Sequence, residues 1–139
     1  MSEVFVDTSA IYAILIPDDP DHPAAREVVD DLEREDATLV TSSAVVYETV
    51  ALLQRRIGVG AVRRFRESVE PALDIRWVDR IAYDAAMAAL LTANARDVSL
   101  VDWTSFAVMR ANGWRRAFAF DDDFARQGFE ILSPRGGAA

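Results

Sequence analysis

Short apolar runs alternate with longer amphipathic segments along the whole chain of 139 residues. The short runs are rich in β-favouring residues and predict five strands, at residues 3–6, 38–42, 75–78, 117–120 and 129–132. The segments between them predict helices at residues 8–16, 24–35, 42–57, 61–73, 80–95, 99–111 and 121–128. Three prolines and three aspartates make residues 17–23 a loop.

The order of these elements predicts an α/β fold. Strands separated by helices favour a central, mainly parallel sheet of four or five short strands with helices on both faces. We interpret residues 1–133 as one domain and residues 134–139 as a mobile tail. In such sheets ligands collect at the C-terminal ends of the strands. Asp7 and Asp121 each follow or close a predicted strand, so both are expected at that edge of the sheet.

Composition narrows the possible functions. The net charge of -8 argues against a protein that coats nucleic acid non-specifically, because such binding depends on neutralising phosphates. All 15 basic residues are arginine, which excludes chemistry that needs a lysine, such as a phosphate-binding P-loop or a Schiff base. There is no cysteine, and no apolar run approaches the ~20 residues of a membrane span. Since no signal-peptide pattern is visible, we expect a cytoplasmic protein.

Four acidic residues in separate segments are candidates for a shared site: Asp7, Glu48, Asp102 and Asp121. Three of them also have a local explanation as helix caps, and Asp102 follows Ser99 at the spacing of a capping box. Glu48 has no such explanation, since it lies inside a predicted helix with apolar residues three and four positions away on both sides. We expect Glu48 to face the core, where its charge requires either an arginine partner or a shared cation.

If the four acids converge, their mutual repulsion requires a counter-charge. A set of oxygen ligands with no cysteine and a single histidine suits Mg²⁺ or Mn²⁺ better than zinc. Magnesium keeps several waters, so some of the acids would act through water, and the number of ions, one or two, stays open. Such a site activates water and neutralises the charge on a phosphate during in-line displacement, which is the chemistry of phosphodiester hydrolysis.

At these residues the sequence resembles a PIN domain, and in particular the VapC-type ribonuclease toxins of bacterial toxin–antitoxin pairs. The resemblance spans residues 4–132 and is carried by the motifs VFVDTSAIYAIL, SSAVVYETVALL, SLVDWTSFAVM and AFAFDDDFARQGFEIL. It implies a three-layer α/β/α fold and Mg²⁺- or Mn²⁺-dependent cleavage of RNA that leaves a 5′-phosphate and a 3′-hydroxyl. It also implies a homodimer and a small VapB-like antitoxin that blocks the site.

The resemblance also implies roles for individual residues. Its acidic metal-binding and catalytic set falls on Asp7, Glu48, Asp102 and Asp121. Ser9 is the hydroxyl that supports Asp7 or a water on the metal. Asp123 ranks second to Asp121, because the family pattern fits an acid three residues before Phe124 better.

Residues that contact the substrate are harder to identify. The segment RRIGVGAVRRFR at residues 55–66 holds five arginines, which form either a strip for the RNA backbone or a solvated helix face. Trp103 can stack on an unpaired base or pack in the core. Arg116 precedes a predicted strand and can lie close to the site. The candidates for substrate contacts are Arg55, Arg56, Arg63, Arg64, Trp103 and Arg116.

Other functions remain to be separated from ribonuclease activity. A phosphotransfer receiver domain and a haloacid-dehalogenase-like phosphatase also gather acids at strand ends, but both need a lysine that this chain lacks. A catalytically idle PIN fold that only binds RNA or acts as a scaffold is the main alternative, and the presence of all four acids argues against it. The resemblance also implies that the apolar helices around residues 10–16 and 42–57 carry a dimer or antitoxin surface, which the sequence alone does not distinguish from core.

Overall fold

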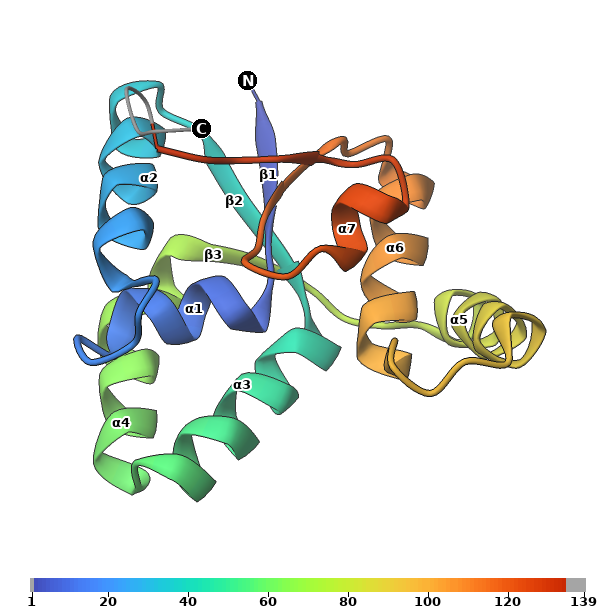
Figure 1. Cartoon of the computed structure of the whole chain (residues 1–139), viewed down its shortest axis with the longest axis horizontal. Coiled ribbons are helices and arrows are strands. Elements are labelled where there is room, and N and C mark those ends of the chain that lie inside the picture. Colours follow the sequence, from blue (N-terminus) through green and yellow to red (C-terminus); the bar gives the residue numbers. More distant parts are fainter. Residues whose placement is uncertain (1, 135–139) are drawn as a thin grey trace.

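The computed structural model describes residues 2–134, so residues 135–139 of the expected tail lie outside the described part. Five strands form one sheet in which every neighbouring pair is parallel. Their order in the sheet is β3-β2-β1-β4-β5 (Figure 1). The bounds of the strands are β1 Glu3–Val6, β2 Thr38–Ser42, β3 Leu73–Arg76, β4 Arg116–Phe118 and β5 Glu130–Ile131. The sequence-based expectation of a mainly parallel sheet of short strands is confirmed.

Seven α-helices connect these strands within the described residues. Their bounds are α1 Thr8–Leu15, α2 His22–Arg34, α3 Ser43–Arg56, α4 Val59–Arg64, α5 Arg80–Ala93, α6 Leu100–Asn112 and α7 Asp123–Arg126. A π-helical turn, Phe65–Val69, and a 3-10 turn, Glu70–Ala72, continue the chain from α4 to β3. Figure 1 shows α5 at one extremity of the molecule, and it packs mainly against α6.

The sheet is covered on both faces, which gives the expected three layers. On one face Phe5 of β1 meets Phe124 of α7, which in turn packs edge-on against Phe106 of α6. On the other face Val6 and Phe118 point toward the side chains of α1 and α2. Because β1 is buried on both faces, its side chains are apolar at consecutive positions rather than alternating, as a central parallel strand requires.

Several element boundaries differ from the sequence prediction. β3 begins at Leu73, two residues before the predicted strand at 75–78, because Leu73 and Ile75 alternate inward on this edge strand. Trp77, expected inside the strand, follows it and is 71% exposed. α2 begins at His22, inside the predicted loop, since Pro23 is tolerated in a first helical turn. The predicted helix at 61–73 is divided into α4, the π-helical turn and the 3-10 turn, and the 3-10 turn contains Pro71.

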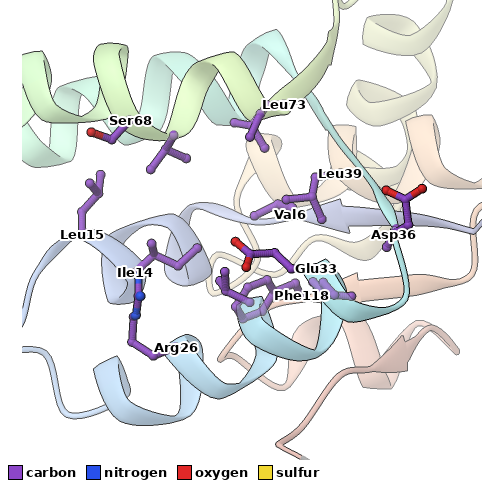
Figure 2. Close-up of a pocket in the computed structure, with 15 residues that line it drawn as sticks. Val6, Ile14, Leu15, Arg26, Glu33, Asp36, Leu39, Ser68, Leu73 and Phe118 are labelled. Atoms are coloured by element: carbon purple, nitrogen blue, oxygen red, sulfur yellow. The ribbon is translucent and has the colours of Figure 1, made fainter.

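A cavity of about 510 Å³ lies between α1, α2, the β2–β3 edge of the sheet and the turns after α4. We call it the apolar groove, because most of the residues that line it are apolar, among them Ile14, Leu15, Val29, Leu39 and Leu73. Figure 2 shows Leu15 of α1 and Ser68 of the π-helical turn on opposite sides of it.

No helix among residues 2–134 combines the length and the apolar character that crossing a membrane requires.

Candidate metal centre

β1 is the central strand of the sheet, with β2 on one side and β4 on the other. From β1 the chain continues to β2 and β3 on one side of the sheet, and it then returns to form β4 and β5 on the other side of β1. The direction in which strands are added therefore reverses between β1 and β4. In open parallel sheets, the C-terminal edge at such a reversal is where ligands bind. Asp7 directly follows β1, and Asp121 lies three residues after β4. Both expected acids therefore lie at this edge, as the sequence predicts.

Asp7 links the end of β1 to the start of α1. Its backbone is extended, and its carboxylate Oδ2 accepts a hydrogen bond from the Ser9 N–H at 3.2 Å, which makes it the N-cap of the helix. Its own N–H donates to the Phe118 carbonyl at 3.0 Å, which ties this turn to β4. The side chain is only 3% exposed. The local interpretation of Asp7 as a cap is thus correct, and it accounts for one of the two carboxylate oxygens.

Ser9 holds two separate segments together. Its hydroxyl donates to Asp7 Oδ2 at 2.7 Å and accepts from the Phe120 N–H at 2.9 Å. This side chain therefore connects the turn after β1 with the segment that carries Asp121. The expected contact between Ser9 and Asp7 is present.

Asp102 reaches the same place from the first turn of α6. Ser99 is the N-cap of this helix, and the two residues form a reciprocal capping box. Asp121 accepts a hydrogen bond from the Asp123 N–H at 3.1 Å, which orients its carboxylate. One carboxylate oxygen from each of Asp7, Asp102 and Asp121 lies within 4.8 Å of the others. Three acids from distant parts of the chain thus converge, and we call them the acidic cluster.

Burial makes this cluster unfavourable without a counter-charge. Burial raises the pKa of Asp7 to about 7, with the charges of Asp121 and Asp102 adding to the rise and the Ser9 hydrogen bonds opposing it. Burial also raises the pKa of Asp102 and of Asp121. Asp7 Oδ1 is buried and has no hydrogen-bond partner among residues 2–134. An unpaired buried oxygen beside two further carboxylates fits the ligand set of a divalent cation.

Glu48 lies beside the acidic cluster but outside it. Its side chain is half-buried and lines a cavity of about 370 Å³ that also contains Asp7, Asp102 and Asp121. The expectation that it faces the core is wrong, because the buried stripe of α3 runs through Val45, Thr49 and Leu53 and turns Glu48 toward the cavity. Within residues 2–134 no arginine forms an ion pair with it.

This acidic cavity also contains residues that sequence reasoning did not select. The two walls are formed largely by α1 and α3, with Asp19 and Asp21 contributed by the loop between α1 and α2. Its full lining is Asp7, Thr8, Ser9, Tyr12, Asp19, Asp21, Glu48, Leu52, Arg56, Ser99, Asp102, Phe120 and Asp121. The four-residue spacings of Thr8 with Tyr12 and of Glu48 with Leu52 and Arg56 are the sequence signal that places each set on one helix face.

The predicted substrate arginines divide into different locations. Arg56 lines the acidic cavity, whereas Arg55, Arg63 and Arg64 are exposed and are not part of its lining. The expected position of Arg116 near the site is wrong. It begins β4, at the opposite end of the strand from Asp121, and forms hydrogen bonds with Glu35 and Ser2.

Two further candidates have structural contacts. Trp103 is half-buried, packs edge-on against Phe106 at 5.5 Å between ring centroids, and is not part of the cavity lining, which favours the core-packing interpretation. Asp123 forms an ion pair with Arg126 at 3.2 Å and lies outside the acidic cluster. Its backbone N–H supports Asp121, which agrees with its second rank.

Comparison with known proteins shows which family has this sequence pattern and this fold. The PIN-domain family model matches residues 4–130. The 23S rRNA-specific endonuclease VapC20 of Mycobacterium tuberculosis is 34% identical over 132 residues, which cover 94% of this chain and 98% of the relative. The crystal structure of VapC20, described as a Sarcin-Ricin loop cleaving toxin, superposes with a TM-score of 0.81 over 94% of this chain and 99% of that one.

More distant structures share the fold. FitAcB from Neisseria gonorrhoeae is 16% identical, with a TM-score of 0.69 over 96% of this chain and 99% of that one. VapBC2 from Rickettsia felis, solved bound to a promoter DNA fragment, is 15% identical, with a TM-score of 0.67 over 94% and 97%. Together, the family match over nearly all of the sequence, the 34% identity and the shared architecture show that the chain belongs to the PIN-domain family.

Proposed function

We propose that this chain is a divalent-metal-dependent endoribonuclease and the toxin of a toxin–antitoxin pair. The observation that carries the proposal is the acidic cluster, in which oxygens of Asp7, Asp102 and Asp121 lie within 4.8 Å of one another. The relative VapC20, which covers nearly all of the chain, is an endonuclease specific for 23S rRNA. We assign RNA as the substrate class and hydrolysis to a 5′-phosphate and a 3′-hydroxyl as the reaction.

We assign different roles at such a site to different residues of the cavity. Asp7, Asp102 and Asp121 would hold Mg²⁺, or Mn²⁺ as the alternative, as one or two ions. A bound ion of this kind activates water and neutralises charge on the phosphate. Ser9 keeps Asp7 in place through its hydroxyl. Glu48 lines the cavity wall, where its carboxylate would accept a hydrogen bond from water or from the substrate.

Cleavage of defined RNAs with mapped ends tests the proposal. The wild type and Asp102→Asn are incubated with Mg²⁺, Mn²⁺ or EDTA and a panel of labelled RNAs that includes a sarcin–ricin loop hairpin. We expect metal-dependent cleavage with 5′-phosphate ends by the wild type and its loss in the variant. RNA binding by the wild type with no cleavage of any panel member would instead support the catalytically idle PIN fold.

A small antitoxin is the second part of the proposal. Structures with this fold include a toxin–antitoxin complex from Klebsiella pneumoniae and VapBC complexes. We assign the antitoxin's apolar segment to the apolar groove, because α1 lines that groove with Ile14 and Leu15 and the acidic cavity with Thr8 and Tyr12. A segment lying along α1 would therefore reach the cavity and block it.

Co-expression with the product of a neighbouring small gene tests this assignment. Leu15→Glu places a charge in the apolar groove, so this variant should keep RNA cleavage and lose both co-purification and inhibition. The matched control is Val59→Glu on α4, an exposed apolar residue outside the lining of the apolar groove and outside α5, which should retain both. If Leu15→Glu binds the antitoxin with wild-type affinity, the antitoxin does not bind in the apolar groove.

A homodimer is the third part of the proposal. α5 buries only Ala86, while Ile81 is 80% exposed. Tyr47 of α3 and Tyr83 of α5 line a shallow apolar hollow that makes this surface continuous across two helices. Its exposed charges, Arg80 and Asp84, are paired with each other, so a second copy can approach this face despite the net negative charge of the chain.

A further inference from the structure

The acidic cavity extends well beyond the acidic cluster. Glu48, Leu52 and Arg56 follow each other at four-residue intervals along α3, and all three line the cavity. Eight residues of helix span about 12 Å, so Arg56 lies roughly two helical turns from Glu48. Thr8 and Tyr12 of α1 line the same cavity. The cavity therefore runs along both helices, with Glu48 and the acidic cluster at one end and Arg56 with Tyr12 at the other, and Asp19 and Asp21 join it from the loop after α1.

Arg56 is the one basic residue among the residues that line this cavity. Six of those residues are acidic: Asp7, Asp19, Asp21, Glu48, Asp102 and Asp121. Within residues 2–134 Arg56 nevertheless forms no ion pair. Its guanidinium carbon instead lies 5.6 Å from the centre of the Tyr12 ring, as in a cation–π contact. Stacking on the ring restricts the guanidinium and leaves its N–H donors available to a ligand.

We propose that Arg56, oriented by Tyr12, binds a phosphate of the RNA that neighbours the cleaved bond. The inference rests on the proposed ribonuclease function. A guanidinium fork matches the oxygens of a phosphate, and its position at the far end of the cavity places it away from the phosphate at the acidic cluster. A polyanionic substrate that enters an acid-lined cavity requires a cationic contact there, and among the lining residues Arg56 supplies it.

Arg55 provides a matched control for this role. Both arginines lie in the last turn of α3, where either one stabilises the helix through its dipole. Both side chains are exposed, and replacing either with alanine changes the net charge equally. Only Arg56 lines the acidic cavity and contacts Tyr12. A difference between the two alanine variants therefore reports the cavity contact rather than the charge or the helix end.

The experiment compares wild type, Arg56→Ala and Arg55→Ala on one RNA oligonucleotide that the wild type cleaves. KM and kcat are measured with Mn²⁺, and the Kd of the same RNA is measured in EDTA at several salt concentrations. We expect Arg56→Ala to raise KM and Kd about tenfold, to leave kcat within about twofold, and to lower the salt slope by about 0.7. Arg55→Ala should stay within about twofold of wild type in all of these.

Two further variants test how Arg56 is oriented. Arg56→Lys keeps the charge but loses the planar fork, so its KM should fall between those of wild type and Arg56→Ala. Tyr12→Leu removes the ring and should raise KM with Arg56 still present, while Tyr12→Phe should match wild type. The melting temperature of each variant, measured in parallel, separates a loss of folding from a loss of binding.

Three outcomes would overturn the inference while the proposed function stands, and a fourth would overturn both. Equal effects of Arg55→Ala and Arg56→Ala would show that the total charge matters and the cavity contact does not. If Arg56→Ala binds Mn²⁺ more tightly and RNA with unchanged affinity, then Arg56 serves as a counter-charge for the acids and not as a phosphate contact. If the wild type cleaves RNA and Arg56→Ala does so with wild-type KM, the inference fails alone. If the wild type cleaves no RNA, the proposed function fails, and the inference falls with it.

Discussion

At the scale of single residues, the structural and chemical interpretations of the acids are compatible. Asp7 uses Oδ2 to cap α1 and to bind the Ser9 hydroxyl, while Oδ1 is buried without a partner among residues 2–134. Asp102 closes a capping box and also belongs to the acidic cluster. Cap signals in the sequence therefore predict where these acids lie, because capping fixes the backbone beside a strand end or a helix start. They do not predict convergence, which depends on the tertiary fold.

The first prediction concerns the stability of the metal-free protein. Replacing Asp7 by Asn keeps an oxygen that accepts from Ser9 and removes a buried charge. Because the folded pKa of Asp7 is raised from 3.8 to about 7, ionisation costs stability in the folded state. Below pH ~4 Asp7 is protonated in both the folded and the unfolded chain. As the pH rises to about 7, the free energy of unfolding of the wild type should fall by up to about 4 kcal/mol relative to that of Asp7→Asn, and it should not change further above that pH.

Urea unfolding in EDTA between pH 4 and pH 8 measures this difference. Asp122→Asn is the matched control, since its side chain is 87% exposed and its substitution should leave the pH dependence unchanged. An Asp7→Asn variant that is much less stable than wild type at pH 7 would mean that the negative charge of Asp7 is needed to hold the fold.

At the scale of secondary-structure elements, the sequence predicts most of the strands and helices but not how helices are rotated. Short apolar runs predict β1 and β2 with correct bounds, because strands in the middle of a parallel sheet are apolar on both faces. The prediction that Glu48 faces the core is wrong because consecutive residues of a helix point in directions that differ by about 100°. Apolar neighbours alone do not show which of these directions meets the core. Arg116 is misplaced because residues before a strand lie at the edge opposite the ligand site.

The capping box of α6 gives a prediction at this scale. Ser99→Ala removes the hydroxyl that accepts from the Asp102 N–H and should cost ~1 kcal/mol of stability while most of the RNA cleavage remains. Asp102→Asn keeps an oxygen that accepts from the Ser99 N–H, so it should retain stability and lose cleavage. Unfolding and cleavage assays on both variants check this. Loss of cleavage in Ser99→Ala at unchanged stability would contradict the division of roles.

At the scale of the whole molecule, the sheet order explains why distant acids meet. β1 lies between β2 and β4, so the residues after β1 and β4 share the edge where the strand order reverses. Alternating strands and helices predict a parallel sheet, but they do not fix which strands are neighbours, because that is decided by packing across the chain. The strand pattern placed both Asp7 and Asp121 at the C-terminal edge of the sheet, and their meeting there follows from β1 and β4 being neighbours.

The exposed surface of α5 gives the prediction about assembly. If this surface joins two copies, Ile81→Asp should convert a dimer to a monomer, because it places a charge at an apolar contact. Val59→Asp on α4 is the matched control, since Val59 is also an exposed apolar residue and Figure 1 shows α4 far from α5. Light scattering after size-exclusion chromatography measures both. A wild-type monomer, or a dimer that persists in Ile81→Asp, would exclude this interface.

On this account, Asp7, Asp102 and Asp121 together hold one divalent cation centre. Calorimetric titration of Mn²⁺ into metal-free wild type, Asp7→Asn, Asp102→Asn and Asp121→Asn tests it most directly, with Asp122→Asn as the control. We predict that wild type and the control bind equally and that each of the other three variants loses about tenfold or more in affinity. Wild-type affinity in any one of those three would contradict a shared centre.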